Sequence, residues 1–328
     1  MMRKPLHIAA FLVATALALA SCTGQQRTNS STSGIAKVNC DESFRNILDQ
    51  EIEVFEYSYP DASIMPRYMN EAAALDSLLH KKCDLIITSR DLTDDQRDIL
   101  KKQGRAYRSR KIAVDAVAII VNKNNDIDEL SMSDLRDIFS GKSMRWGQVF
   151  PTKLKNDSVI VVFDGSGTGV MHYMKEHFLD GGNFAGNVYA QKSTDDVFRV
   201  IQSRKNAIGF VGVSWITADL KDAERTIEEK VVDLKEKNDV SVIDFTDRIK
   251  VLAIRGDEQV QACKPYQAYI NDGSYPLFRT IWAIDASAGG TLDHGFFSFL
   301  TGVIGQKIIL QTGILPAAEP VRYVEAVK

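Results

Sequence analysis

The chain has 328 residues, a length that suits two domains of ordinary size, and its formal net charge is −3. Hydrophobic residues make up 45% of it and charged residues 25%, which excludes a mainly disordered chain. Because acidic and basic side chains nearly balance, no nucleic-acid partner is expected, and any anion site must be built locally from a few well-aimed donors.

Residues 1–21 are predicted to be a secretory signal peptide. Arg3 and Lys4 precede an apolar run, Ile8 to Ala20, that is too short to span a bilayer as a mature helix. The run ends in Leu19-Ala20-Ser21-Cys22, which resembles the lipobox of bacterial lipoproteins. This resemblance implies cleavage before Cys22 and lipidation of its thiol, and therefore a membrane-anchored lipoprotein of the cell envelope, in the periplasm. An ordinary signal peptide with a chance cysteine is the alternative.

Residues 22–34 are predicted to form a lipidated, flexible tether. The segment is rich in Ser, Thr, Gln, Asn and Gly, so it cannot bury enough apolar surface to offset its ordering entropy. Three cysteines remain beyond it, Cys40, Cys83 and Cys263, and their spacing matches no zinc pattern. They are expected to be buried or free thiols, and no metal or other cofactor is expected.

Apolar segments alternate with amphipathic ones along the rest of the chain. Strands are expected at 35–39, 84–88, 116–121, 159–163, 208–212 and 277–284. Helices are expected from 43 to about 56, from 93, at 131–139, after 169, and at 294–311, and the charged stretch 218–239 is expected to be a surface hairpin or loop. Such alternation indicates parallel sheets with helices on both faces, in which ligands bind beyond the carboxyl ends of the strands.

The strongest local signal is the turn Asp164-Gly165-Ser166-Gly167-Thr168, directly after a strand. Glycines let the backbone bring several N–H groups toward one point, and the helix that follows adds its unpaired N–H groups. Ser166 and Thr168 add hydroxyl donors. The turn therefore predicts a neutral cradle for a tetrahedral oxyanion, with a plain strand-to-helix turn as the alternative.

The same glycines do not match the nucleotide or hydrolase motifs. Val170 stands where the dinucleotide fingerprint needs its third glycine, and no Gly-Lys-Ser/Thr follows for a P-loop. Asp164 stands where a nucleophile elbow needs glycine. No nucleophile–base pair or metal cluster is visible, so an enzyme is not expected.

Two further turns could contribute to an anion site. Arg90, beside Ser89 at a strand end, is a natural bidentate donor to an oxyanion, and a surface salt bridge is its alternative. Ser43-Phe44 offers a hydroxyl and N–H groups at a helix start, and a plain N-cap is its alternative.

Segments along nearly all of residues 35–328 resemble a known family in their order and spacing. They are Asp41-Glu42-Ser43-Phe44, Thr88 to Thr93, Asp115 to Asn122, Leu135 to Lys142 with Trp146, Asp164 to Thr168, Ala207 to Gly212, Tyr275 to Arg279, Gly305-Gln306 and Leu315 to Ala317. The family is the phosphate-binding lipoproteins of phosphate ABC transporters, PstS-like and of the Bacteroidetes type. It implies an α/β, type II periplasmic-binding-protein fold. Two lobes, 35–121 with 266–328 and 122–265, would be joined by two crossover strands.

The resemblance also implies a function. A monomeric, non-enzymatic solute-binding protein would bind phosphate between its lobes and deliver it to an ABC permease in the inner membrane. The ligand-binding residues implied by the resemblance and the turns are Ser43, Phe44, Ser89, Arg90, Ser166, Gly167 and Thr168, with Asp41 or Asp164 as the proton acceptor. Alternatives are another oxyanion such as molybdate or sulfate, or a sensor or scaffold lipoprotein without transport.

This chain departs from the family at three site positions. The family's arginine falls on Val162, its acceptor aspartate falls on or beside Arg90, and its Ser-Gly-Gly turn falls near Asn70-Glu71-Ala72. Arg90 is therefore the predicted source of positive charge.

Overall fold

A computed structural model describes residues 29–165, 167–216, 226–227, 229 and 249–318. One mixed sheet organises these residues, with the strand order β2-β1-β3-β11-β4-β8-β6-β7, and β9 and β12 also pair with β4. Its strands are β1 (Gly34–Asp41), β2 (Ala62–Met69), β3 (Leu85–Thr88), β4 (Arg108–Asn122), β6 (Ile160–Phe163), β7 (Val188–Ala190), β8 (Ala207–Gly212), β9 (Ile249–Val251), β11 (Phe278–Asp285) and β12 (Leu315–Pro316). A small separate sheet pairs β5 (Glu129–Ser131) with β10 (Ala253–Arg255).

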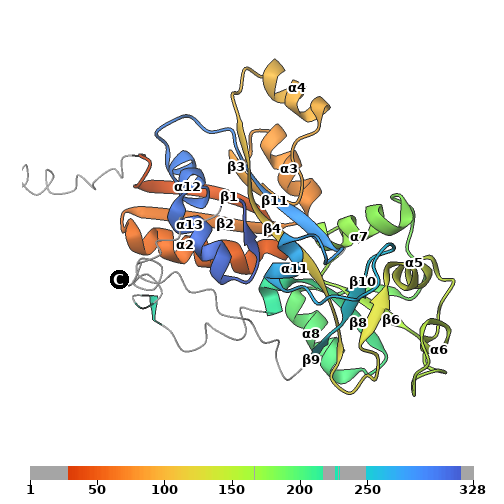
Figure 1. The fold of residues 1–328 in the computed structure, drawn as a ribbon. Coiled ribbons are helices and arrows are strands. Elements are labelled where there is room, and N and C mark those ends of the chain that lie inside the picture. The colour runs from red at the N-terminus through yellow and green to blue at the C-terminus, as the bar shows by residue number, and fades with distance from the viewer. Residues whose placement is uncertain (1–28, 166, 217–225, 228, 230–248, 319–328) are drawn as a thin grey trace, which may run out of the picture.

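The helices lie between these strands in sequence, and α2, α12 and α13 pack beside the part of the sheet that contains β1 and β2 (Figure 1). They are η1 (Glu42–Phe44), α2 (Arg45–Ser58), α3 (Glu71–Leu79), α4 (Asp94–Lys102), α5 (Met132–Ser140), α6 (Trp146–Val149), α7 (Gly169–Leu179), α8 (Thr194–Ser203), α11 (Gln267–Asn271), α12 (Leu292–Leu300) and α13 (Val303–Gln311).

The first half of the sheet comprises β2, β1, β3, β11 and the start of β4, and helices cover both of its faces. Val38 and Cys40 on β1 belong to the same core cluster as Phe296 of α12. Asn39 points to the other face, where its Nδ2 donates to Ser77 Oγ of α3 at 2.7 Å. Ile86 of β3 packs there as well, in a second cluster. The alternation along each strand thus builds two cores from one sheet.

The second half of the sheet comprises the end of β4 with β8, β6, β7 and β9. Its core contains a group of packed phenylalanine rings, in which the Phe163 and Phe210 centroids are 5.0 Å apart and Phe139 lies 5.2 Å from Phe210. Both strands of the β6–β8 pair run parallel and are nearly fully buried, as expected for strands with helices on each side.

The long strand β4 joins the two halves (Figure 1). Its residues 108–116 pair with β11, and its residues 117–121 pair with β8. Between these two partners, Val117 N–H donates to the Leu277 carbonyl at 2.9 Å, just before the chain enters β11. The sheet is mixed rather than purely parallel, because β4 and β11 run antiparallel to their neighbours. The predicted lobe boundaries remain a prediction.

Several local expectations need correction. The expected helix at 294–311 is two helices, because Gly302 ends the turn after α12 and is the N-cap of α13. Strand β2 and helix α3 are not among the elements expected from the sequence. Pro66 interrupts the strand pattern of β2, but β2 is an edge strand, where proline is tolerated. The end of the predicted tether is packed, because Asn29 Oδ1 accepts from Leu292 N–H at 3.0 Å and Gly34 already belongs to β1.

Other expectations concern the cysteines and the ends of the chain. Cys40, Cys83 and Cys263 are free thiols, the first two buried, as predicted. The signal peptide, Cys22 and most of the charged stretch 218–239 lie outside the described residues. Among the described residues, no helix is long and apolar enough to cross a membrane.

Candidate ligand-binding site

A buried arginine lies where the two halves of the sheet meet. Arg279, near the start of β11, is only 4% exposed. Its Nη1 donates to Ser43 Oγ at 2.9 Å and its Nη2 to Asp115 Oδ2 at 3.0 Å. Its guanidinium carbon lies 4.3 Å from the centroid of the Phe44 ring. Its Nε has no hydrogen-bond partner among the described residues, so the guanidinium retains an unused donor.

The register of the sheet explains how this charge is held. Arg279 on β11 stands opposite Asp115 on β4, and both side chains are almost fully buried. A buried charge is costly unless it is paired, and each residue supplies the other's partner. Burial raises the pKa of the Asp115 carboxyl, and the Arg279 charge opposes that rise.

The glycine-rich turn lies beside this arginine. Thr168 is the N-cap of α7, and its Oγ1 donates to Asp164 Oδ1 at 2.8 Å. Gly167 has φ +84°, in the left-handed region that favours glycine. A Cβ at Gly169 would lie 3.0 Å from Arg279 Nη1 and 3.1 Å from Ser89 Oγ, so the missing side chain lets α7 approach both. Ser166 lies outside the described residues.

The η1 turn completes the group around Arg279. Ser43 N–H donates to Asp41 Oδ1 at 3.0 Å, and the Ser43 hydroxyl donates to the same oxygen. Gly169 N–H donates to Asp41 Oδ2 at 2.9 Å. From the segment that follows β8, Trp215 Nε1 donates to the Ser43 carbonyl at 2.9 Å. We name Asp41, Ser43, Phe44, Asp115, Asp164, Gly169 and Arg279 the Arg279 site.

The predicted pair Ser89 and Arg90 both contact Glu71, but only Ser89 also lies close to Gly169 of the site. Ser89 Oγ lies close to Gly169, and both its hydroxyl and its N–H, the latter at 2.9 Å, donate to Glu71 Oε2. Arg90 instead pairs through Nε with Glu71 Oε1 at 3.2 Å and through Nη1 with Gln96 Oε1 at 3.2 Å, and its side chain is 37% exposed. Arg90 as a ligand residue remains a prediction, and the geometry favours Arg279 for that role.

The Arg279 site contains more acidic than basic side chains. Asp41, Asp115 and Asp164 are each 1% exposed or less, and Arg279 is the basic side chain that contacts Asp115 directly. Asp164 Oδ2 has no partner among the described residues, and burial raises the pKa of this carboxyl to about 6. Burial also raises the pKa of Asp41, against the opposing effects of Arg279 and of the Ser43 hydrogen bonds. Such a site offers hydrogen-bond acceptors as well as donors.

A family model described as a PBP superfamily domain matches residues 25–302. The chain belongs to the PBP superfamily. A curated relative, the phosphate-binding protein PstS of Staphylococcus saprophyticus, is 23% identical over 299 residues, covering 90% of this chain and 84% of the relative. The resemblance to PstS-like proteins predicted from sequence is thereby confirmed.

Solved structures share the fold. A phosphate ABC transporter substrate-binding protein with bound phosphate from Clostridium perfringens superposes with a TM-score of 0.66 and 19% identity, over 87% of this chain and 100% of that one. An ABC-type phosphate transport receptor from Vibrio cholerae gives 0.60 and 18%, over 86% and 100%. These likenesses confirm the predicted type II fold of this PBP-superfamily protein. The names of these relatives describe phosphate-binding or substrate-binding proteins of transporters and not enzymes.

The sequence alone did not nominate Arg279 or Asp115 as site residues. One signal was present: a charge inside the apolar run Phe278-Arg279-Thr280-Ile281-Trp282 must be either exposed or paired. No group of three or more His, Cys, Asp or Glu that could hold a metal ion occurs among the described residues.

Proposed function

We propose that this chain is the solute-binding protein of an ABC importer, which binds phosphate between its two lobes and delivers it to a membrane permease. One observation carries the proposal. Arg279 is buried, its Nε donor is unused, and it lies beside both Gly169 at the start of α7 and the Ser43 turn. Donors from both halves of the sheet therefore meet at one point. The names of the relatives, which are phosphate-binding proteins, support the same ligand.

The excess of carboxylates supports phosphate over a fully ionised oxyanion. Asp164 Oδ2 is a buried acceptor without a partner among the described residues. A phosphate that carries a proton can donate to such an oxygen, whereas sulfate or molybdate would bring only repulsion between negative charges. Ser89, Gly167 and Thr168 would complete the ligand's surroundings, together with Ser166.

Cys22 bears on where the protein is located. We propose that Cys22 is lipidated, so that a monomeric receptor stays anchored in the cell envelope, in the periplasm, and works without catalysing a reaction. The Leu19-Ala20-Ser21-Cys22 pattern supports the anchor. Replacing Cys22 with serine should release the protein from the membrane fraction, and mass spectrometry of the wild-type protein should find the acyl chains.

The decisive experiment is calorimetry of protein freed of phosphate, titrated with phosphate, sulfate and molybdate. We expect saturable binding of phosphate at a ratio of one and binding of the other two at least about a hundredfold weaker, from a difference of roughly 3 kcal/mol. Tighter binding of sulfate or molybdate would reassign the ligand. An absence of binding to all three would favour a sensor or scaffold.

A further inference from the structure

The Asp41 carboxylate occupies donors that face each other across the junction between the two halves of the sheet. Its Oδ1 accepts from the N–H and the hydroxyl of Ser43, which follows β1. Its Oδ2 accepts from the N–H of Gly169 at 2.9 Å, the first residue of α7 and 128 residues further along the chain. Asp41 is completely buried, so all of these bonds form away from solvent.

These three donors are the kind that an oxyanion uses. The first N–H groups of a helix have no partner within the helix, and they bind anions readily. The Ser43 hydroxyl, which donates to Asp41, in turn accepts from Arg279 Nη1 at 2.9 Å. A carboxylate of the chain itself therefore takes the place at these donors that a bound anion would take.

Asp164 is in a different situation. Its Oδ1 accepts from the Thr168 hydroxyl, while its Oδ2 has no partner among the described residues. Asp164 is thus free to accept a hydrogen bond from a protonated ligand, whereas both oxygens of Asp41 are already used. The two carboxylates suggested by the sequence as alternative acceptors have separate roles.

We propose that Asp41 is an internal anion that links the two lobes and competes with the ligand for the donors of Ser43 and Gly169. The inference rests on the proposed function, since it concerns regulation of the same site. An incoming oxyanion must exchange places with Asp41 at the start of α7 and must also overcome its negative charge. Asp41 therefore lowers the affinity and holds the lobes together when no ligand bridges them.

The test is Asp41→Asn, which keeps the shape of the side chain. The amide oxygen can still accept from Ser43, but the amide nitrogen cannot accept from Gly169 N–H, and the charge is lost. We expect phosphate to bind at least about tenfold more tightly, and the phosphate-free protein to show a larger radius of gyration in small-angle scattering. The matched control is Glu42→Gln, which removes the same charge from a neighbour whose side chain pairs with Arg45 instead. It should leave both quantities unchanged.

Either of two results with the Asp41→Asn variant would overturn the inference. Weaker phosphate binding by Asp41→Asn would make Asp41 an acceptor for the ligand, and an unchanged radius of gyration would remove its role as a link between the lobes. A second measurement needs only the wild-type protein. The Gly169 amide has no partner within its own helix, so Asp41 should protect it from hydrogen exchange in phosphate-free protein, as seen by residue-resolved NMR. Fast exchange there would also overturn the inference.

Failure of the proposed function and failure of the inference about Asp41 would give different results in these experiments. Failure of the wild-type protein to bind phosphate would refute the proposed function. The scattering and exchange measurements would still test the Asp41 link, because they are made without phosphate.

Discussion

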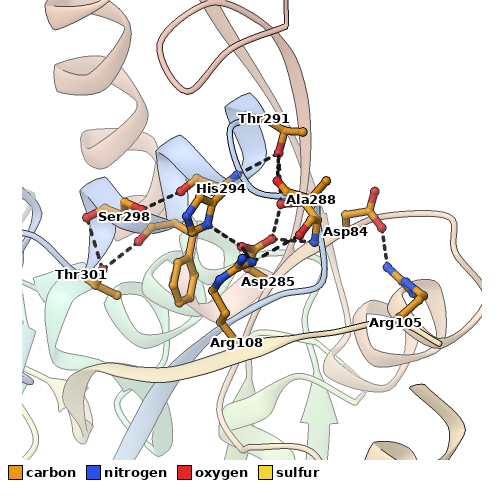
Figure 2. A network of polar contacts seen from close by, with 11 residues as sticks. Asp84, Arg105, Arg108, Asp285, Ala288, Thr291, His294, Ser298 and Thr301 are labelled. Carbon is orange, nitrogen blue, oxygen red and sulfur yellow. Dashed lines mark hydrogen bonds and ion pairs between the residues drawn. The ribbon is translucent and has the colours of Figure 1, made fainter. Parts of the chain in front are cut away.

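Strand β11 carries a buried charge near each of its ends, and the two charges have different surroundings. At the end away from the Arg279 site, Asp285 accepts hydrogen bonds at both oxygens (Figure 2). Arg108 Nη1 and His294 Nδ1 contact its Oδ2 at 3.1 and 3.0 Å, and the N–H and hydroxyl of Ser287 donate to its Oδ1 at 2.8 and 2.5 Å. At the other end, Arg279 Nε has no partner among the described residues.

This difference separates a structural network from a binding site. Buried polar groups are nearly always satisfied in folded proteins, because each unmade hydrogen bond is expensive. The Asp285 network follows that rule and needs nothing more. Around Arg279, three buried polar atoms, Arg279 Nε, Asp115 Oδ1 and Asp164 Oδ2, lack hydrogen-bond partners among the described residues, and a bound ligand could supply partners for Arg279 Nε and Asp164 Oδ2. Mutations at the two ends of β11 test this difference.

The largest effect is expected from Arg279→Ala. Without Arg279, a bound phosphate would lack its buried charged partner, which costs on the order of 2–5 kcal/mol of binding free energy. Phosphate affinity should therefore fall by at least about thirtyfold in calorimetry. Arg279→Lys should recover part of it, because an ammonium reaches one partner but cannot repeat the guanidinium fork. Circular dichroism should check that both variants are folded. A folded alanine variant with unchanged affinity would show that Arg279 only balances Asp115.

Asp164→Asn should change how the free energy of unfolding depends on pH, because it removes a buried carboxylate that lacks a partner at one oxygen. The pKa of Asp164 is raised from its ordinary 3.8 to about 6, and below pH 3.8 the group is protonated in both the folded and the unfolded state. Between these values folding takes up a proton, so stability falls as the pH rises through 6, by at most about 3 kcal/mol. Urea denaturation without phosphate should therefore show the asparagine variant gaining stability over wild type between pH 4.5 and 7.5. A constant difference would contradict this.

Asp285→Asn should lower the stability of the folded protein at neutral pH. The amide nitrogen would face the donors of Arg108 and His294, both partly exposed, so the variant should lose about 1–3 kcal/mol in urea denaturation. Phosphate affinity should stay the same, because Asp285 lies at the other end of β11. A loss of affinity in a stable variant would mean that the two ends are coupled.

The smallest effect is expected from Arg90→Ala. Its ion pair with Glu71 is partly exposed, and such pairs contribute roughly 0–1 kcal/mol. We therefore expect phosphate affinity to change by less than about threefold. A thirtyfold loss would restore Arg90 as the source of positive charge, as the sequence had indicated.

The sequence predicted the fold better than the arrangement of charges. The turns after β1, β3 and β6 could be found because strand ends, glycines and capping residues are local signals. The choice between Arg90 and Arg279 could not be made, because it depends on partners distant in sequence. Glu71, which pairs with Arg90, is 19 residues away, and Asp115, which pairs with Arg279, is 164 residues away. Periodicity shows which strands are buried but does not show which residues stand opposite each other.

The position of β11 also bears on how the protein is made. Although β11 lies between β3 and β4 in the sheet, it follows both by more than 150 residues, after the whole second half of the sheet has been synthesised. The folding chain must therefore hold β3 and β4 without their shared neighbour until β11 pairs with both. Contacts over such long separations form slowly, and unpaired strand edges invite aggregation meanwhile. The strand that closes the sheet also carries Arg279, so a folding chain cannot form the Arg279 site before the first half of the sheet is complete.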